Sequence, residues 1–341
     1  ENQQIIFTKW DGKSPQDIEN QITYPLTSSL LGLPKVKTIR ANSMFGVSSI
    51  YIIFEDDVDV YWSRSRVLEK LNAIPKNLLP QGVQPSLGPA ASGLGQVFWY
   101  TLEARDEHGN PTGFWDLEER RRIQDELVKP VLQSSKDVAE VASIGGFVKE
   151  YQVDIKPERL KQYNLSLQDV AKAIKNSNVE IGAQTIEINR VEYLVRGLGY
   201  IKSASDLENA VLSSSEFKSV RLKDVAHISF GPAARRGILD KSGAEAVGGV
   251  VLARYGSNAM EVIDELKLKI NQLQQSLPKK TLENGQTSQL QIVPFYDRSV
   301  LIKESLGTLE HALGLELLIT VLVVLLMLFD LRASILVSSL L

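Results

Sequence analysis

An apolar run near the C-terminus sets the strongest constraint on how this chain can fold. Ala312–Phe329 reads ALGLELLITVLVVLLMLF, with Glu316 and Thr320 as its polar interruptions. As a helix rising 1.5 Å per residue, about 18 residues would measure roughly 27 Å, close to the hydrocarbon thickness of a bilayer. A helix in the core of a soluble protein usually keeps one polar face, whereas this run is apolar all round. The run therefore predicts a membrane crossing that follows a long, water-soluble region.

The residues after the run predict the start of a second crossing. A short turn, DLR at 330–332, leads into an apolar stretch at 333–341. Arg332 favours a cytoplasmic turn, because short cytoplasmic loops of membrane proteins are enriched in Lys and Arg. The large region before the crossing would then face outward. Glu1–Trp10 has neither the basic start nor the apolar core of a signal peptide, so this orientation requires an export signal or membrane helix upstream; otherwise the soluble region stays inside.

The composition of the chain indicates what kind of protein the water-soluble region is. A chain of 341 residues, 23% of them charged, predicts two or three folded domains rather than a disordered chain. The formal net charge of −3 gives no basic footprint for binding nucleic acid. The absence of cysteine excludes disulfides and thiolate metal sites, and it is compatible with an oxidising compartment.

The N-terminal part follows the order β-α-β-β-α-β, which is the split βαβ arrangement of ferredoxin-like domains. Ser14 is a suitable helix cap and Pro15 suits the first helical position, whereas Pro25 should kink the same helix because proline lacks an amide hydrogen. The predicted elements are strand Gln3–Lys9, a helix from Ser14 to Leu33, strands Val36–Ala41 and Val47–Phe54, helix Val60–Ile74 and strand Val83–Leu87.

The same order then begins a second time and is interrupted. Val97–Glu103 reads as a strand, and Asp116 with Glu119 forms a capping box for the next helix. Val138–Ile144 and Phe147–Ile155 are predicted to pair as a hairpin around two glycines. The elements that complete this second unit come much later: strand Val247–Tyr255, helix Asn258–Leu277, a surface loop at Lys279–Ser288 and strand Leu290–Tyr296.

Lys156–Lys241, between the two parts of the second unit, reads as an inserted domain. Its predicted elements are helix Ser166–Ile174, a hairpin across Ile181–Val195 and a strand at Ala226–Phe230. The sequence therefore predicts an α+β fold. It consists of tandem ferredoxin-like βαββαβ subdomains with an inserted α/β subdomain, followed by a transmembrane α-helix.

No enzymatic site is visible. The three histidines, His108, His227 and His311, have no metal-ligand spacing, and HExxH, P-loop and nucleophile-elbow motifs do not occur. Gly93-Leu94-Gly95 precedes a strand rather than opening a helix, which argues against nucleotide binding. We therefore expect neither catalysis nor a cofactor.

Three charged features have both a functional and a structural interpretation. The acidic run Glu55–Asp59 could bind a cation, but such runs more often end a strand in solvent and discourage edge pairing. Arg235-Arg236 could bind an anion or position a domain at the surface. Glu316 lies in the membrane run and could serve function there, or its side chain could reach the interface.

Several long segments resemble one transporter family. The segments are PQDIENQITYPLTSSLLGLPKVKTIRANSMFG, FEDDVDVYWSRSRVLEKLN, GPAASGLGQVFWYTLE, VAEVASIGGFVKEYQVDI, DVAHISFGPAARRGI and VPFYDRSVLI. Together they make the chain similar to the heavy-metal efflux branch of the RND (resistance-nodulation-division) transporters, over essentially its whole length. The resemblance assigns 1–95 to porter subdomain PN1, 96–155 with 242–298 to PN2, 156–241 to the docking subdomain, 299–329 to the connecting and second transmembrane helix, and 333–341 to the start of the third.

The resemblance implies a proton-driven homotrimer, embedded in the lipid of the bacterial inner membrane as a multi-pass protein with residues 1–310 in the periplasm. It would export metal ions through a periplasmic adaptor (a membrane fusion protein) and an outer-membrane channel, without binding nucleic acid. The first transmembrane helix is expected upstream of Glu1. The proton-relay carboxylates are expected beyond Leu341, as are most metal ligands, which belong to a second periplasmic loop.

The metal is less directly indicated. Relatives that export divalent zinc or cobalt tend to carry a carboxylate after the Gly-Leu-Gly motif, where this chain has Gln96, a poorer ligand for such ions. Copper and silver relatives use methionine thioethers, and this chain has only Met44, Met260 and Met327. The general similarity favours Cu(I) or Ag(I). Gln96 and Trp99 are candidates for lining the transport cleft, and no metal site is expected in this part of the protein.

Alternatives to a copper or silver pump remain: a pump for divalent zinc, cobalt, cadmium or nickel, an RND pump for drugs and other amphiphiles, and a membrane-anchored periplasmic sensor. The sequence beyond Leu341 would discriminate. A pump continues into several more helices and a second copy of the porter domains, whereas a sensor ends in a cytoplasmic signalling domain.

A soluble protein of residues 1–310 should bind Cu(I), Ag(I) or Zn(II) only weakly. High-affinity soft-metal sites need two to four converging thiolates, thioethers or imidazoles, and here Met44 and Met260 fall in different predicted subdomains. Calorimetry would measure this. A one-to-one site of sub-micromolar affinity, lost on changing either methionine, would show that this part binds metal by itself.

Overall fold

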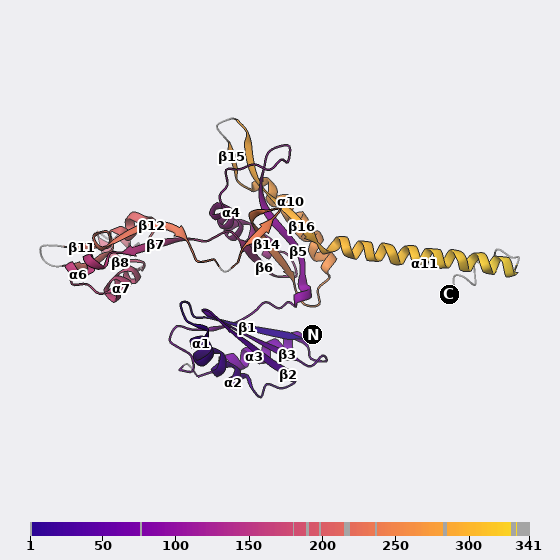
Figure 1. Ribbon diagram of the computed structural model, residues 1–341, viewed down its shortest axis with the longest axis horizontal. Coiled ribbons are helices and arrows are strands. Elements are labelled where there is room, and N and C mark those ends of the chain that lie inside the picture. Colours follow the sequence, from indigo (N-terminus) through magenta and orange to yellow (C-terminus); the bar gives the residue numbers. More distant parts are fainter. Residues whose placement is uncertain are drawn as a thin grey trace. The chain divides into compact units, whose positions relative to one another are not determined.

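The computed structural model describes residues 2–328, apart from 76, 180, 189–190, 198, 215–218, 236 and 282–284, together with residue 332; the side chains of 181–188, 191–197, 214 and 326–328 are also outside the description. The chain forms two compact units, Glu1–Gly146 with Ile238–Leu341, and Phe147–Gly237 (Figure 1). Both are mixtures of helices and strands, which confirms the α+β class.

The first unit begins with a four-stranded antiparallel sheet in the order β2-β3-β1-β4. Alternate residues of β1 and most of β3 are buried against helices, and Ile6, Ile52 and Phe54 are fully enclosed. The elements are β1 (Gln3–Lys9), α1 (Pro15–Ile18), η1 (Glu19–Thr23), α2 (Tyr24–Leu30), β2 (Val36–Met44), β3 (Val47–Phe54), α3 (Val60–Asn72) and β4 (Pro85–Leu87).

The expected kink at Pro25 takes the form of a π-helical segment. η1 leads directly into α2, and Pro25 lies in the first turn of α2. The same arrangement recurs at Pro130, in the first turn of α5 (Lys129–Gln133), directly after the π-helical η3 (Gln124–Val128). A proline inside a helix removes one hydrogen bond and crowds the carbonyl four residues earlier, and a π-helical turn relieves that crowding by widening the helix. The two parts of the first unit thus share a local irregularity.

The rest of the first unit is a six-stranded sheet in the order β13-β14-β5-β16-β15, with β6 paired to β14. All its strand pairs are antiparallel. The elements are η2 (Gly93–Gly95), β5 (Gln96–Arg105), α4 (Leu117–Ile123), β6 (Val138–Gly145), β13 (Leu239–Lys241), β14 (Ala244–Ala253), α10 (Ala259–Ser276), β15 (Lys279–Thr281) and β16 (Thr287–Asp297).

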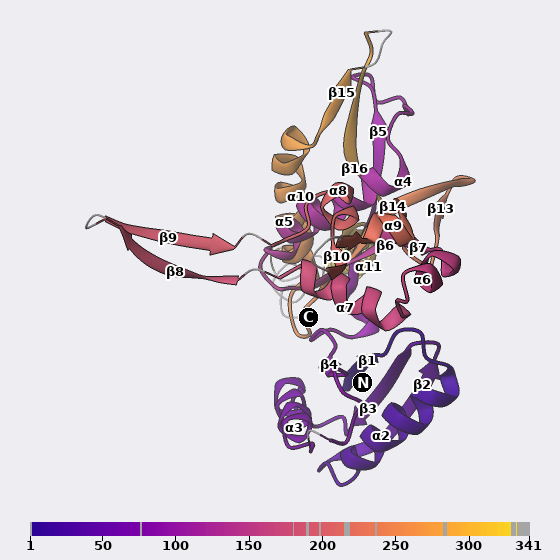
Figure 2. The ribbon, with the colours of Figure 1, turned by 90° about the vertical axis from the view of Figure 1, so that its left-hand side faces the viewer.

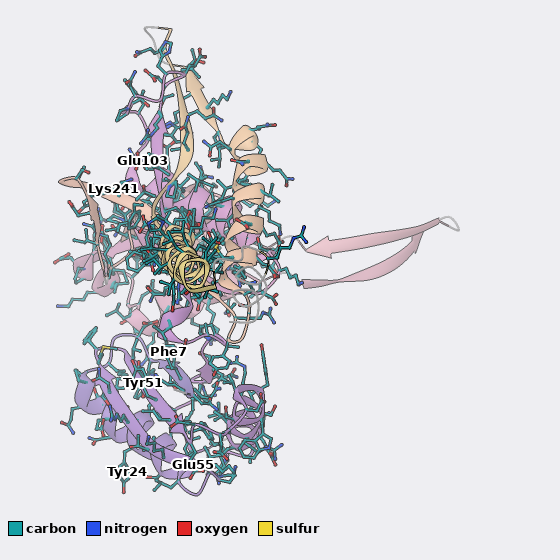
Figure 3. The ribbon with its side chains drawn as sticks, turned by 90° about the vertical axis from the view of Figure 1, so that its right-hand side faces the viewer. Phe7, Tyr24, Tyr51, Glu55, Glu103 and Lys241 are labelled. Atoms are coloured by element: carbon teal, nitrogen blue, oxygen red, sulfur yellow. The ribbon has the colours of Figure 1, made fainter. Side chains whose placement is uncertain are left out.

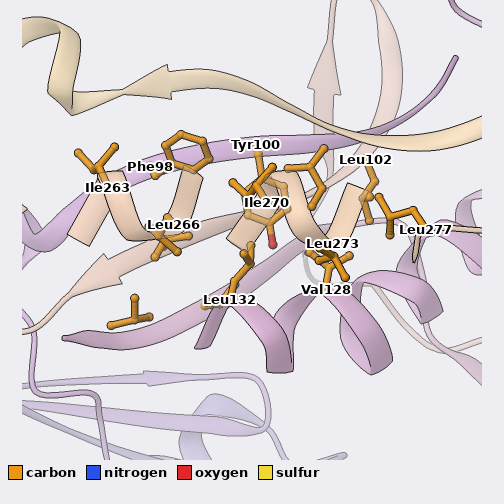
Figure 4. Close-up of a cluster of buried hydrophobic side chains, with 14 of the residues drawn as sticks. Phe98, Tyr100, Leu102, Val128, Leu132, Ile263, Leu266, Ile270, Leu273 and Leu277 are labelled. Atoms are coloured by element: carbon orange, nitrogen blue, oxygen red, sulfur yellow. The ribbon is translucent and has the colours of Figure 1, made fainter. Parts of the chain in front are cut away.

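The largest hydrophobic core among the described residues lies against one face of this sheet (Figure 4). Phe98, Tyr100 and Leu102 project from β5 toward Leu266 of α10 and Leu132 of α5, and all five are at most 1% exposed. Asn258 caps α10, and Asp116 forms the predicted capping box with Glu119 at the start of α4. Two helices far apart in sequence therefore share one face of the sheet.

The predicted hairpin around Gly145-Gly146 is wrong. β6 pairs with β14, whereas β7 (Lys149–Ile155) and β12 (Ala226–Pro232), both of the second unit, pair with each other. Both glycines have positive φ, of 79° and 62°, and a Cβ on Gly146 would lie 2.7 Å from the carbonyl oxygen of Leu117. The two glycines lead the chain out of the sheet instead of turning it back. The second compact unit starts at Phe147, directly after the two glycines.

The second unit surrounds a small core of its own, with Val170, Leu222 and Val225 among its buried residues. Figure 2 shows its predicted hairpin, β8 with β9, as a long two-stranded ribbon. The elements beyond β7 and β12 are α6 (Pro157–Gln162), α7 (Leu167–Ser177), β8 (Ile181–Ile188), β9 (Val191–Gly197), α8 (Ala204–Glu208), β10 (Val211–Ser214), β11 (Ser219–Arg221) and α9 (Leu222–Val225).

A second prediction to be corrected is the surface loop at Lys279–Ser288. Its first residues form β15, which pairs with the start of β16 through Lys279 opposite Gln289 and Thr281 opposite Thr287. The polar composition of this stretch concealed a short strand at the edge of the sheet.

The C-terminal helix α11 (Arg298–Leu328) contains the apolar run. Within its segment Arg298–Leu325, an 18-residue window has a mean hydropathy of 1.9, and none of that window is buried against other parts of the chain. Within the described residues, α11 is the one helix whose length and composition would suit a membrane crossing. The second predicted crossing, 333–341, lies outside the described residues.

Leu266→Ala should lower the free energy of unfolding by about 2–5 kcal/mol, because Leu266 is fully buried and its truncation leaves a cavity. Leu268→Ala is the matched control: it lies on the same helix, is 64% exposed, and should change stability by no more than about 0.5 kcal/mol. Urea unfolding followed through Trp115, which belongs to the same core, would compare them. Equal losses would contradict the placement of α10.

Candidate functional site

Both candidate residues, Gln96 and Trp99, lie at the start of β5. The Gly-Leu-Gly motif forms the 3₁₀ turn η2, and Gln96 begins the strand directly after it, as predicted for a glycine motif that precedes a strand. The turn lies close to the end of β14, because a Cβ on Gly95 would be 2.9 Å from the carbonyl oxygen of Ala253. Glycine is therefore needed here for close backbone approach.

Trp99 is the centre of an aromatic cluster. Its ring lies 5.9 Å from that of Phe295 at 83°, and 5.8 Å from that of Tyr296 at 60°, both in the edge-to-face arrangement that aromatic pairs prefer. A register shift between Pro294 and Tyr296 brings two successive aromatic residues of β16 to one tryptophan. The Trp99 indole nitrogen is buried and has no hydrogen-bond partner within the described part of the chain.

The alternation of side chains along β5 is interrupted between Gln96 and Trp99. Val97 and Phe98 are successive residues that are both buried in the core, and the pairing of β5 with β14 shifts register between Phe98 and Gln96. From Phe98 onward the regular alternation resumes, with Phe98 and Tyr100 on the core face and Trp99 on the outer face. The common role of Gln96 and Trp99 in lining a cleft stays a prediction.

A charged cluster continues this outer face beyond Trp99. The Glu103 carboxylate lies 2.5 Å from Lys241 Nζ and 2.7 Å from Arg105 Nη2, and it accepts a 2.7 Å hydrogen bond from Thr101 Oγ1. Lys241 Nζ also lies 5.7 Å from the centre of the Phe295 ring, joining the two clusters. Figure 3 labels Glu103 and Lys241 in this region.

The electrostatics of the charged cluster centre on Glu103. Burial by itself raises the pKa of Glu103, but hydrogen bonds from Lys241, Arg105 and Thr101 outweigh it and lower the pKa to about 2. The carboxylate is therefore ionised throughout the physiological range and fully engaged by two cations. An incoming metal ion would have to displace Lys241 or Arg105, so the cluster is a structural ion pair network rather than an open metal site.

The soft-metal ligand candidates are dispersed. Met44 ends β2 in the four-stranded sheet and is 45% exposed, whereas Met260 lies in the first turn of α10. His108 lies after β5, His227 in β12 and His311 in α11. Within the described residues, no three His, Cys, Asp or Glu side chains gather in a group that could hold a metal ion.

The acidic run and the arginine pair have structural contacts. Asp57 forms a 2.8 Å ion pair with Lys35, and Asp59 caps α3 by accepting a 2.7 Å hydrogen bond from the amide of Trp62. Arg235 lies 6.0 Å from the centre of the Phe147 ring, and its neighbour at 236 lies outside the described residues. These contacts support the structural interpretation of the acidic run.

The first unit also contains an open groove of about 390 Å³. It is lined by β1, α3, β4, α5 and β6, with Arg64, Lys129 and Glu140 as its charged residues. Arg64 is already engaged, since it donates a 2.7 Å hydrogen bond to the carbonyl oxygen of Gly88. A groove with both signs of charge selects no particular ion.

Sequence reasoning missed Phe295 and Tyr296 as neighbours of Trp99, and it missed the ion pair between Glu103 and Lys241. Glu103 and Lys241 are 138 residues apart, and their pairing depends on the return of β13 and β14 to the sheet. The aromatic pair in VPFYDR was a visible signal, but its approach to Trp99 depends on a register shift that no local pattern reveals.

Comparison with known proteins gives a consistent result. A sequence model of the AcrB/AcrD/AcrF family matches residues 2–340. The chain is 45% identical over 333 residues to cation efflux system protein CusA of Escherichia coli O157:H7, covering 97% of this chain and 30% of that protein. It is 43% identical over 334 residues to putative cation efflux system protein SilA of Salmonella typhimurium, with the same coverage of 97% and 30%.

A solved structure shows the same fold. The X-ray crystal structure of a heavy metal efflux pump superposes with a TM-score of 0.85 at 29% sequence identity, covering 99% of this chain and 32% of that one. The chain thus spans about 30% of the length of the curated relatives that it matches.

Glu103→Gln should lower the thermal midpoint near neutral pH by roughly 2–4 °C, because it removes the negative partner of Lys241 and Arg105. The folded-state pKa of about 2 lies below the ordinary 4.5, so the stabilisation is present above about pH 4.5 and is lost as the pH falls toward 2. Thermal scans across this range should show the two proteins converging at low pH. Glu107→Gln, in an exposed loop, is the control, and a difference that persists at pH 2 would contradict the role of the charge.

Proposed function

The chain belongs to the AcrB/AcrD/AcrF family, and we propose that it forms the periplasmic porter and docking part of a proton-driven RND pump that exports heavy-metal cations. The observation that carries the proposal is the continuous match, along almost the whole chain, to proteins named as cation efflux systems. Since the chain is only part of the length of those proteins, the activity belongs to a larger assembly.

We propose a division of labour among the parts of the chain. Residues 1–95, with their own four-stranded sheet, act as PN1, and 96–146 with 238–298 act as PN2. The second compact unit, Phe147–Gly237, acts as the docking subdomain toward neighbouring protomers of a homotrimer and an outer-membrane channel. α11 acts as a transmembrane helix in the bacterial inner membrane, with a periplasmic adaptor completing the assembly.

We propose Cu(I) or Ag(I) as the substrate. Soft monovalent ions are recognised by thioethers, and the dispersion of Met44 and Met260 means that the principal ligands come from elsewhere in the pump. Trp99, with Phe295 and Tyr296, would supply an aromatic wall to the cleft instead of ligands. Gln96 disfavours the divalent alternative, because a neutral amide is a poorer partner for Zn²⁺ or Co²⁺ than a carboxylate.

The full-length protein, expressed in bacteria that lack their own metal pumps, should restore growth in copper or silver but not in zinc or cobalt. Protection against zinc or cobalt alone would establish the divalent alternative. Protection against dyes or detergents alone would favour an amphiphile pump, and no protection, with a signalling response to metal, would favour a sensor.

Gln96→Glu should raise tolerance to zinc or cobalt about twofold or more, because it adds a carboxylate ligand at the edge of the cleft. Gln81→Glu, at an exposed loop position, makes the same chemical change and should have no effect. Growth inhibition would be compared at equal protein levels in the membrane. Equal responses of the two variants would show that residue 96 does not face the metal path.

A further inference from the structure

The junction between β16 and α11 carries two adjacent side chains of opposite charge. Asp297 ends β16 and Arg298 begins α11. Each contacts a different element of the first unit. The junction is the point at which the sheet that carries Trp99 continues into the membrane helix.

Asp297 fixes the first turn of α11. Its Oδ1 accepts hydrogen bonds from the Ser299 amide at 2.9 Å and from Ser299 Oγ at 2.6 Å, which caps the helix. Its Oδ2 lies 2.5 Å from Lys267 Nζ of α10, and the same ammonium lies 3.0 Å from Ser299 Oγ. Ser299 is only 1% exposed, whereas the Lys267 side chain is 40% exposed, so α10 and the start of α11 are joined by a small, partly buried network.

Arg298 reaches in a different direction. Its Nη1 donates a hydrogen bond to the carbonyl oxygen of Leu94, in the middle of η2. The Leu94 side chain is 78% exposed, so the contact is made to the backbone of the turn and not to an apolar surface. The turn is tightened further by the Gly95 amide, which donates a 2.9 Å hydrogen bond to the Ser92 carbonyl oxygen.

We propose that Arg298 is a positioning residue that links the membrane helix α11 to the turn η2, so that a displacement of α11 moves the start of β5 and with it Gln96 and Trp99. This inference rests on the proposed transport function. It assigns a role to a residue that neither touches the substrate nor belongs to the aromatic cluster.

The geometry makes this link direct. Gln96 directly follows η2. Asp297, the residue before Arg298, pairs with Phe98, which is next to Trp99 in β5. The Arg298 guanidinium is hydrogen-bonded to a backbone carbonyl, so it holds the main chain of the turn itself rather than a side chain on it. α11 has 31 residues, which corresponds to roughly 46 Å of helix, so a small tilt inside the membrane produces a displacement at its first turn.

Spin-label distance measurements would test the link. The chain has no cysteine, so Leu94→Cys and Leu306→Cys, both at exposed positions, provide two defined labelling sites on η2 and α11. The full chain would be placed in lipid nanodiscs and diluted with unlabelled chain. Arg298→Met should broaden the distance distribution about twofold, because it keeps an unbranched apolar side chain and removes the hydrogen-bond donors.

Two further variants make the result specific. Arg298→Lys keeps a charged donor and should retain most of the narrow distribution. Lys303→Met removes an exposed cation from the same helix and should leave the distribution unchanged. An unchanged distribution in Arg298→Met, or equal broadening in Lys303→Met, would overturn the proposed link.

Transport by the full-length pump in liposomes provides the functional readout. Arg298→Met should lower kcat several-fold with KM within about twofold of the wild type, because coupling is lost while substrate contacts remain. A wild-type protein that moves no metal, combined with a distribution that broadens as expected, would reject the proposed function and leave the link intact. A transporting wild type and an equally fast Arg298→Met variant would reject the role of the link.

Discussion

The packing of α10 onto β5 is the interaction on which the first unit depends. Leu266 and Ile263 are fully buried against a strand that precedes them by more than 150 residues, so the core closes only after the chain has completed the second unit and returned. The return is possible because the chain leaves and re-enters the sheet at one place: a Cβ on Gly145 would lie 2.9 Å from that of Leu239. Long-range closure of this kind costs loop entropy, which the large apolar core offsets.

Local structure could be read from the sequence wherever a capping residue or a periodic pattern marked it. Asp116 with Glu119 and Asn258 begin helices as predicted, and β1 has the predicted bounds. Strand partnership could not be read in this way. Gly145-Gly146 has the composition of a tight turn, yet the partner of β7 is β12, more than 70 residues later. Composition reports that the backbone can turn, whereas the direction it takes depends on tertiary contacts such as the crowding between Gly146 and Leu117.

The candidate site shows the same limit. Trp99 could be named from a family resemblance, but its neighbours Phe295 and Tyr296 reach it through a register shift in a strand close to 200 residues away. The pairing of Glu103 with Lys241 likewise depends on the order of strands in the sheet. The expectation of no metal site rests on residue counts, because three methionines and three histidines spread over the whole sequence offer few ways to converge, and it stays a prediction.

The π-helical turns before Pro25 and Pro130 bear on the history of the molecule. Each behaves as a single-residue insertion that cannot be removed without driving a proline ring into the helix. A helix acquires such an irregularity rarely and, once packed, loses it with difficulty. It occurs in both parts of the first unit in the helix between the first two strands, which is the pattern that duplication of an ancestral subdomain carrying the proline would leave.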